Sequence, residues 1–273
     1  MKVLDLFSGI GGFSLGLERT GGFETVAFCE IDPFCRKVLA KHWPDVRQYD
    51  DVRTLTAERL RADGIVPDVI CGGFPCQDIS VAGRREGLDG TRSGLWGELC
   101  RLVDELRPQF AIVENVSGLL AGPSDQPGGW FGRVLGDLAE IGFDAEWHCI
   151  PAAAVGAPHI RDRLWIVAYP GEVRRNAWRP EQSLQGPWMD GQASVGNAHR
   201  PRLEGLWGLL ECAGKQSAWA DGEADEDGRL VKPGLPLLAH GVSARMERIA
   251  STGNAVVPQI PELIGRAILR AAA

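Results

Sequence analysis

The sequence predicts an α/β fold built on a parallel sheet that helices cover on both faces. Over residues 1–170, short apolar runs alternate with amphipathic helical stretches, a pattern typical of such sheets. A glycine-rich turn follows the first run, at the place where open parallel sheets bind cofactors. From residue 171 to about residue 234 neither period persists for long. The sequence therefore also predicts a small, irregular second domain.

The elements follow in order along the first part of the chain. Six strands are predicted, at residues 3–7, 25–29, 69–72, 110–114, 145–150 and 164–168. Five helices are predicted between them, at residues 12–20, 34–42, 57–62, 95–106 and 131–141. Pro33 suits the first turn of the second helix. The fourth helix has a core face of residues at helical spacing: Leu95, Leu99, Leu102, Val103 and Leu106.

Residues 171–239 are predicted to form a region of their own. Gly, Pro, Trp, Gln and charged residues dominate it, and this aromatic content exceeds what a solvated linker carries. A compact recognition region is the favoured interpretation, and an insertion with a minor core of its own is the alternative. Four of the nine tryptophans lie there: Trp178, Trp188, Trp207 and Trp219.

The C-terminal end is predicted to return to the first domain as helices. Residues 243–249 and 260–269 have helical periodicity, and the second stretch places Leu263, Ile264 and Ile268 on one face. The expected division of the chain is residues 1–170, 171–239 and 240–273.

Composition favours a soluble, cytoplasmic protein. No apolar run approaches the roughly 18 residues that cross a bilayer, and the N-terminal MKVLDLFSGIGG lacks a signal-peptide core. The net charge of −7, taken as an average, opposes nucleic-acid binding. However, 24 of the 29 basic residues are Arg, the better bidentate partner for phosphate and guanine. A GC-rich genome produces the same bias, so composition leaves the partner open.

The seven cysteines show no paired CxxC spacing. They predict neither a disulfide framework nor a zinc site, and no metal is expected. Most should be buried free thiols, with Cys71 inside its strand.

The turn after the first strand reads Phe7-Ser8-Gly9-Ile10-Gly11-Gly12. As a dinucleotide fingerprint it fails, because Ser14 occupies the third glycine position. The next strand ends at Glu30, whose carboxylate can accept both hydroxyls of a ribose, and Asp51 follows a third strand without clear bounds. Glycines and acids together predict a nucleoside cofactor.

Two further strand ends bring reactive groups to the same edge. The strand at 69–72 runs into Gly73-Phe74-Pro75-Cys76-Gln77, which makes Cys76 a candidate nucleophile. The strand at 110–114 ends in Glu114, a carboxyl group that can hydrogen-bond a pyrimidine ring nitrogen and its amino group. Apolar surroundings would raise the pKa of Glu114.

Five motifs in this order, FSGIGG, PCQ, ENV, RxR and GNAVVP, resemble the cytosine-5 DNA methyltransferase family. The order is the specific part, and the resemblance covers residues 1–170 and 240–273. It implies a Rossmann-like sheet of the S-adenosylmethionine-dependent methyltransferases, and methyl transfer to carbon 5 of a flipped cytosine.

The resemblance also implies roles for individual residues. Cys76 would attack carbon 6 of cytosine, Glu114 would engage N3 and the amino group, Arg163 the O2 oxygen, and Pro75 would bracket the base. S-adenosylmethionine would be held by Phe7, Gly9, Ile10, Gly11, Gly12, Glu30, Ile31, Asp51, Val52, Leu95, Asn254 and Ala255.

Double-stranded DNA is the implied partner, with a monomer in a bacterial or phage-infected cytoplasm as the expected state. Residues 78–94, rich in Gly and Arg, suit a loop that closes over the duplex, although a solvated loop has the same composition. The expected DNA contacts are Gln77, Ser80, Arg84, Arg85, Arg92, Arg161, Arg174, Arg175 and Arg179.

Two positions depart from the family pattern. His159 stands where Gln precedes the two arginines of RxR, and Ile31 replaces a bulkier side chain against the adenine. Neither change removes a catalytic group.

Three alternative functions are an RNA cytosine-5 methyltransferase, a catalytically silent DNA-binding paralogue and a Rossmann dehydrogenase. The region at 171–239 argues against the RNA enzyme, and the presence of Cys76 and Glu114 argues against the silent paralogue. Ser14 and the Pro-Cys-Gln turn argue against the dehydrogenase.

Overall fold

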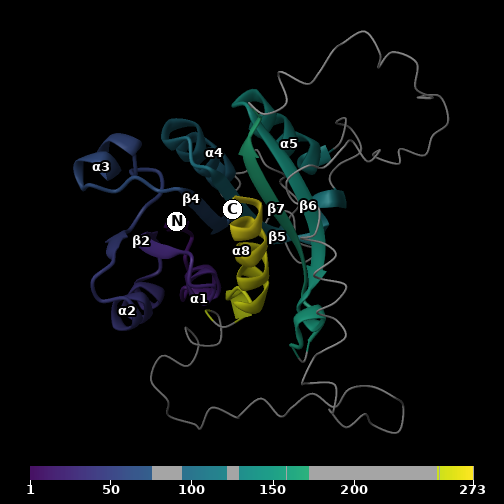
Figure 1. Ribbon diagram of the computed structural model, residues 1–273, viewed down its shortest axis with the longest axis horizontal. Helices are drawn as coiled ribbons and strands as arrows, with labels where there is room; N and C mark the ends of the chain where they lie inside the picture. Colours follow the sequence, from purple (N-terminus) through teal and green to yellow (C-terminus); the bar gives the residue numbers. More distant parts are fainter. Residues whose placement is uncertain (76–93, 122–128, 158, 172–250, 252, 273) are drawn as a thin grey trace, which may run out of the picture.

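A seven-stranded mixed sheet organises the molecule, in the order β3-β2-β1-β4-β5-β7-β6 (Figure 1). The computed structural model describes residues 1–75, 94–121, 129–157, 159–171, 251 and 253–272. The strands are β1 Lys2–Leu6, β2 Glu24–Cys29, β3 Arg47–Tyr49, β4 Val69–Gly73, β5 Phe110–Val116, β6 Phe143–Pro151 and β7 Asp162–Pro170. The helices are α1 Gly12–Glu18, α2 Pro33–His42, α3 Ala57–Ala62, α4 Gly94–Leu106, α5 Gly129–Glu140 and α8 Gln259–Ala272, with short turns η1 Ser117–Ala121 and η2 Ala152–Val155.

The predicted elements within the described residues are confirmed, with small shifts at their ends. β3 has no counterpart among the six predicted ranges, because three residues are too short to show a period. β1 ends one residue early, since Phe7 takes a left-handed φ of 53° and leaves the ladder. The predicted helix at 243–249 and most of the region at 171–239 lie outside the described residues.

The expectation of a wholly parallel sheet is wrong at one side. β1 to β5 pair in parallel, but β7 runs antiparallel to both β5 and β6. Only residues 152–161 connect β6 to β7, and a parallel return needs a crossover of roughly a dozen residues or more. The short connection therefore forces the chain to reverse, and β7 lies between β5 and β6.

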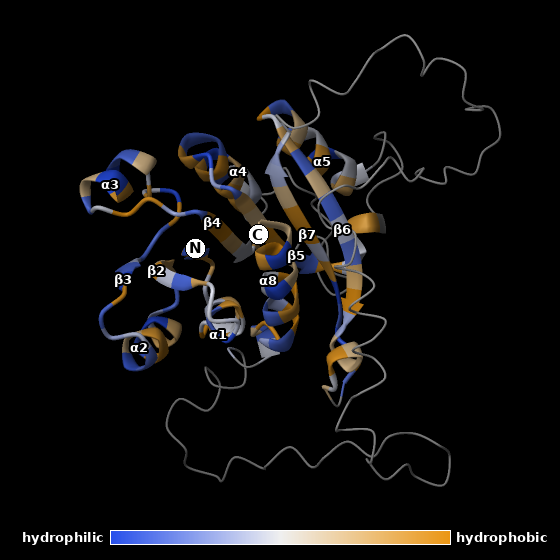
Figure 2. Cartoon of the chain, in the orientation of Figure 1, coloured by the Kyte–Doolittle hydropathy of each residue, from blue (hydrophilic) through white to orange (hydrophobic). Residues whose placement is uncertain are grey.

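Helices cover both faces of the sheet, as predicted, and each face has its own core. α3, α4 and α5 pack on one face through residues such as Leu60, Leu99 and Val134, whereas α1 and α8 pack on the other through Leu17 and Ile264. Figure 2 shows apolar residues along β4 and β7 and hydrophilic residues on α2 and α3. Within the described ranges, no helix has the length and apolar character needed to span a bilayer.

α8 brings the end of the chain back onto α1, next to the glycine-rich turn. Gly16 makes this approach possible, because a Cβ there would lie 2.1 Å from the Pro258 carbonyl oxygen. Of the three residues predicted to share one face of this helix, Ile264 and Ile268 are fully buried and Leu263 is half-buried. The C-terminal helix is therefore part of the same core as the first βα unit.

A carboxyl group is buried beneath the glycine-rich turn. Asp5 on β1 has no exposed surface and accepts a hydrogen bond of 2.7 Å from the Ser14 hydroxyl of α1. Burial raises the pKa of Asp5 to about 7, and the charge of Glu30 adds to the rise. Ser14, which breaks the dinucleotide fingerprint, thus has a structural partner.

Gly16→Ala tests the docking of α8. We expect it to lower the free energy of unfolding by about 3 kcal/mol, because the added methyl overlaps backbone that cannot move aside. Gly97→Ala is the matched control: Gly97 is an exposed position in α4 where an added Cβ would meet nothing within 4 Å, and it should gain about 0.5–1 kcal/mol from helix propensity. Urea denaturation measures both, and equal effects would contradict the packing argument.

Asp5→Asn tests the buried acid through pH. The pKa of Asp5 is about 7 in the native protein against an ordinary 3.8, so its stabilising contribution is complete below about pH 4 and is lost as the pH rises to about 7. Between pH 4 and pH 8 the free energy of unfolding of the wild type should fall relative to that of Asp5→Asn by a few kcal/mol, at about 1.4 kcal/mol per pH unit. Urea titrations across this range measure it, with exposed Asp45→Asn as control. A difference that is constant with pH would contradict the assignment.

Candidate active site

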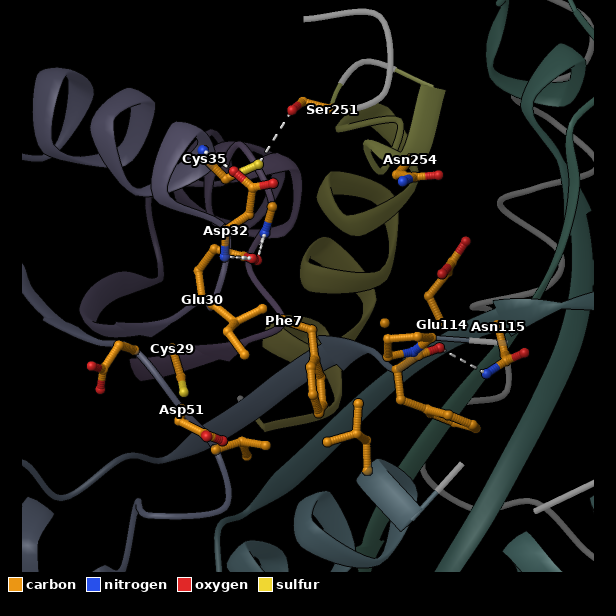
Figure 3. A pocket seen from close by; sticks show the side chains of 18 of the residues that line it. Phe7, Cys29, Glu30, Asp32, Cys35, Asp51, Glu114, Asn115, Ser251 and Asn254 are labelled. Carbon is orange, nitrogen blue, oxygen red and sulfur yellow. Dashed lines mark hydrogen bonds between the residues drawn. The ribbon is translucent and has the colours of Figure 1, made fainter. Parts of the chain in front are cut away.

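The carboxyl ends of the five parallel strands meet at one edge of the sheet, and a cavity of about 580 Å³ lies there (Figure 3). The antiparallel β7 begins at this edge, since Arg163 pairs with Val116 at the end of β5. Four sets of predicted residues line the cavity: Phe7 and Gly9; Glu30, Ile31, Asp51 and Val52; Pro75, Leu95 and Glu114; Arg161, Arg163 and Asn254. The structure thus brings residues predicted to hold a cofactor together with residues predicted to be catalytic, although they lie far apart in the sequence.

The turn after β1 is shaped by left-handed residues. Gly9 and Gly11 have φ values of 53° and 86°, which only glycine adopts without strain. Among the described residues, no atom lies within 4 Å of a Cβ built on Gly9, so the backbone there is open to the cavity. The Ser8 hydroxyl fixes the turn by donating to the Asp5 carbonyl oxygen at 2.6 Å.

Glu30 is held in place by two backbone N–H groups. Gly9 donates to Oε2 at 2.7 Å, and Asp32 donates to Oε1 at 2.8 Å. Asp32 in turn caps α2 by accepting from the N–H groups of Phe34 and Cys35. Each carboxylate oxygen keeps a further lone pair for a ligand hydroxyl, so Glu30 is a fixed acceptor that links the glycine turn to α2.

Asp51 lies at the same end of the cavity as Glu30 (Figure 3). Arg53 holds its carboxylate through hydrogen bonds from Nε at 2.9 and 3.1 Å and from Nη2 at 2.7 Å. These bonds lower the pKa of Asp51. Ile31 is 65% exposed and lines the cavity without being packed into the core.

Glu114 and Arg163 form an ion pair at the other end of the cavity. Arg163 Nε lies 3.1 Å from Glu114 Oε1, and the Glu114 side chain is 13% exposed. Burial raises the pKa of Glu114 although Arg163 and Arg161 oppose the rise, as the sequence predicts. Gly73 makes room for the carboxylate, because a Cβ there would lie 2.8 Å from Glu114 Oε2.

Asn115 fixes the turn that leads to the predicted nucleophile. Its Nδ2 donates to the Phe74 carbonyl oxygen at 3.3 Å, and its Oδ1 accepts from the Val116 N–H at 2.8 Å. Asn115 is 2% exposed. Pro75 lines the cavity directly after this turn, and Cys76 follows it but lies outside the described residues.

Gly11 and Gly12 do not line the cavity, nor do Ile10 and Ala255. The two glycines pack against neighbours instead: a Cβ on Gly11 would lie 2.6 Å from the Trp43 ring, and one on Gly12 would lie 2.6 Å from the Val256 carbonyl oxygen. Close packing therefore explains why glycine is needed at these two positions without any contact to a ligand.

Arg161 is the predicted DNA contact that the structure describes, and it lines the cavity. His159, two residues before it, is exposed and outside the cavity lining. The other predicted contacts lie outside the described residues: Gln77, Ser80, Arg84, Arg85, Arg92, Arg174, Arg175 and Arg179.

Several lining residues escaped prediction. Asn115 stands inside the ENV motif and Phe74 directly precedes the PCQ motif, so both could have been found from their neighbours, whereas Cys35 and Ser251 carry no sequence signal. Cys35 Sγ donates to Ser251 Oγ at 3.4 Å across 216 positions of sequence. The other lining residues that were not predicted are Cys29, Asp32, Asp50, Arg53, Gly73 and Val116.

The cysteines of the described part are free thiols, and all but Cys149 are buried, as expected. Burial raises the pKa of Cys29 to about 12 and also raises that of Cys35. Both thiols at the cavity are therefore protonated and poorly nucleophilic. In the described ranges, no three His, Cys, Asp or Glu side chains gather as metal ligands would.

Comparison with known proteins agrees with this geometry. Residues 1–195 match the family described as C-5 cytosine-specific DNA methylase. The chain belongs to this family. A type II methyltransferase of Bacillus subtilis, M2.BsuMI, is 35% identical over 201 residues, which cover 71% of this chain and 48% of the relative. M.Sau3AI, a type II methyltransferase of Staphylococcus aureus, is 33% identical over 196 residues, which cover 67% of this chain and 47% of the relative.

This family member spans about half the length of the curated relatives that it matches. Solved structures show the same α/β fold. A protein described as a DNA modification methyltransferase encoded within an E. coli prophage has a TM-score of 0.64 at 23% identity, covering 100% of this chain and 99% of its own. A DNMT2 mutant of Spodoptera frugiperda has a TM-score of 0.51 at 23% identity, and the match covers 63% of this chain and 50% of the DNMT2 chain.

Asn115→Asp tests the turn before Cys76. The change replaces the donor to the Phe74 carbonyl by an acceptor, and a buried group left without its partner costs about 1–3 kcal/mol. If this cost falls on the transition state, the rate drops by about tenfold or more. We expect kcat for methyl transfer to fall while the affinity for S-adenosylhomocysteine is unchanged. Gln109→Glu is the control, an equal amide-to-acid change at an exposed site. A weaker affinity for S-adenosylhomocysteine with unchanged kcat would contradict the role of Asn115 in fixing this turn.

Proposed function

We propose that the protein is a DNA cytosine-5 methyltransferase that modifies a cytosine flipped out of a duplex. The observation that carries the proposal is one cavity with two chemically different ends. Glu30 and Asp51 offer acceptors for a nucleoside at one end, and Glu114 lies toward the other (Figure 3). Arg163 pairs with Glu114, and Pro75 lines the same cavity.

The cavity suits S-adenosylmethionine. Its volume of about 580 Å³ falls within the range of ligand pockets, about 300–1,000 Å³. Glu30 would accept from the ribose hydroxyls and Asp51 from the adenine amino group, with Phe7, Gly9, Val52, Leu95 and Asn254 around them. Once bound, this cofactor supplies an electrophilic methyl group on a sulfonium.

The residues at the other end suit cytosine. The Cys76 thiolate adds to carbon 6, which turns carbon 5 into a nucleophile able to take the methyl group. Glu114, whose pKa is raised, donates a proton toward N3 and accepts from the amino group. Arg163 donates to O2 and holds Glu114 in place. Loss of the proton from carbon 5 and departure of the thiolate then restore the aromatic ring and free Cys76.

Access to the face of the ring requires that the base leave the stack, at a cost of a few kcal/mol. We assign residues 78–94 to closure over the flipped base and residues 171–239 to target recognition, between a catalytic part at 1–170 and the return at 240–273. A monomer in the cytoplasm of a bacterium, where duplex DNA and the cofactor occur together, completes the proposal.

A mechanism-based adduct tests the proposal. Duplex DNA with 5-fluorocytosine at varied sites traps the intermediate, because fluorine cannot leave as a proton does. With S-adenosylmethionine we expect a denaturation-resistant complex with the wild-type protein and none with Cys76→Ser. Glu114→Gln should form it at least about a hundredfold more slowly.

The same reaction with fluorinated single-stranded RNA separates the substrates. An adduct on RNA and on no duplex would move the assignment to an RNA methyltransferase. Bound cofactor without an adduct on either nucleic acid would indicate a silent paralogue.

A further inference from the structure

Arg161 has a strained backbone and an engaged side chain. Its φ of 29° is left-handed, a conformation that costs a non-glycine residue energy and persists only where neighbours hold it. Here the Ala152 N–H donates to the Ile160 carbonyl at 2.7 Å and to the Arg161 carbonyl at 3.3 Å. The turn before β7 is thereby fixed from the backbone side.

The guanidinium reaches the returning C-terminal segment. Arg161 Nη1 donates to the Gly253 carbonyl at 2.5 Å, and Nη2 donates to the Asn254 carbonyl at 3.2 Å. These bonds join positions more than 90 residues apart. One planar group with two donors matches two successive carbonyls, a geometry that lysine cannot reproduce.

The segment held by Arg161 borders both ends of the cavity. Asn254 and Ser251 line it, and Ser251 Oγ accepts from Cys35 Sγ of α2 on the cofactor side. Figure 3 shows Ser251 and Asn254 along one side, with Glu30 and Asp51 toward one end and Glu114 toward the other. Two residues beyond Arg161, Arg163 pairs with Glu114. Arg161 thus connects the target-base end to the wall of the cofactor end.

We propose that Arg161 is a positioning residue that holds the Gly253–Asn254 segment against the cavity and so supports cofactor binding, instead of contacting DNA phosphates. This inference rests on the proposed function, because the cofactor must occupy the cavity for the wall to matter. It differs from the DNA contact that the RxR motif suggests for Arg161. Both Nη groups of the Arg161 guanidinium already donate to backbone carbonyls, so a phosphate contact would compete with these two bonds.

Calorimetric titration with S-adenosylhomocysteine in the absence of DNA tests the inference. We expect Arg161→Ala to weaken binding by about tenfold, the loss that follows when two charge-assisted bonds supporting a site are removed. The affinity of Arg161→Lys should lie between those of the wild type and Arg161→Ala, since one ammonium group replaces a guanidinium that donates from two nitrogens. Arg266→Ala is the control, because Arg266 pairs with Glu262 on the exposed side of α8 and should leave affinity unchanged.

The salt dependence of DNA binding provides the opposing readout. A phosphate contact contributes about 0.9 to the slope of log K against log salt for duplex DNA. We expect a folded Arg161→Ala to keep the wild-type slope. Arg161→Lys keeps the positive charge and therefore tests the inference through its affinity for S-adenosylhomocysteine if the alanine variant fails to fold.

Unchanged affinity for S-adenosylhomocysteine in Arg161→Ala, with a slope reduced by about one, overturns the inference and restores the DNA contact. Wild-type protein that binds no S-adenosylhomocysteine overturns the proposed function itself, so the two failures are distinguishable.

Discussion

The ion pair between Glu114 and Arg163 depends on the direction of a single strand. Because β7 runs antiparallel to β5, its first residues lie at the carboxyl edge, and Arg163 comes within 3.1 Å of the Glu114 carboxylate. A parallel β7 would carry the same arginine to the opposite edge. The reversal is set by the short connection after β6, so a loop length determines whether the proposed target-base end of the cavity exists.

The proposed cofactor end depends on a second constraint, the left-handed turn after β1. Gly9 can aim its N–H at Glu30 because its φ is positive, and Glu30 then joins the turn to the start of α2. Gly12 and Gly16 let the returning C-terminal segment approach α1. That segment carries Asn254 back to the cavity, so the two ends of the chain complete one site.

Much of this arrangement could be predicted from the sequence because strand ends carry their own signals. Glycines, Glu30, Pro75 and Glu114 follow apolar runs directly, and the rule that parallel strands present their carboxyl ends together brings them to one edge. The direction of β7, the side-chain bonds of Arg161 and the contact between Cys35 and Ser251 could not be read in this way. They depend on which distant segments pack together, and no local period encodes that.

Hydrogen exchange with and without S-adenosylhomocysteine tests most directly whether this edge of the sheet is the cofactor site. We expect slower amide exchange in peptides that contain Gly9, Asp32 and Asn254, and unchanged exchange in β6. Protection confined to the groove between α2 and β3, lined by Arg36 and Arg47, would contradict it.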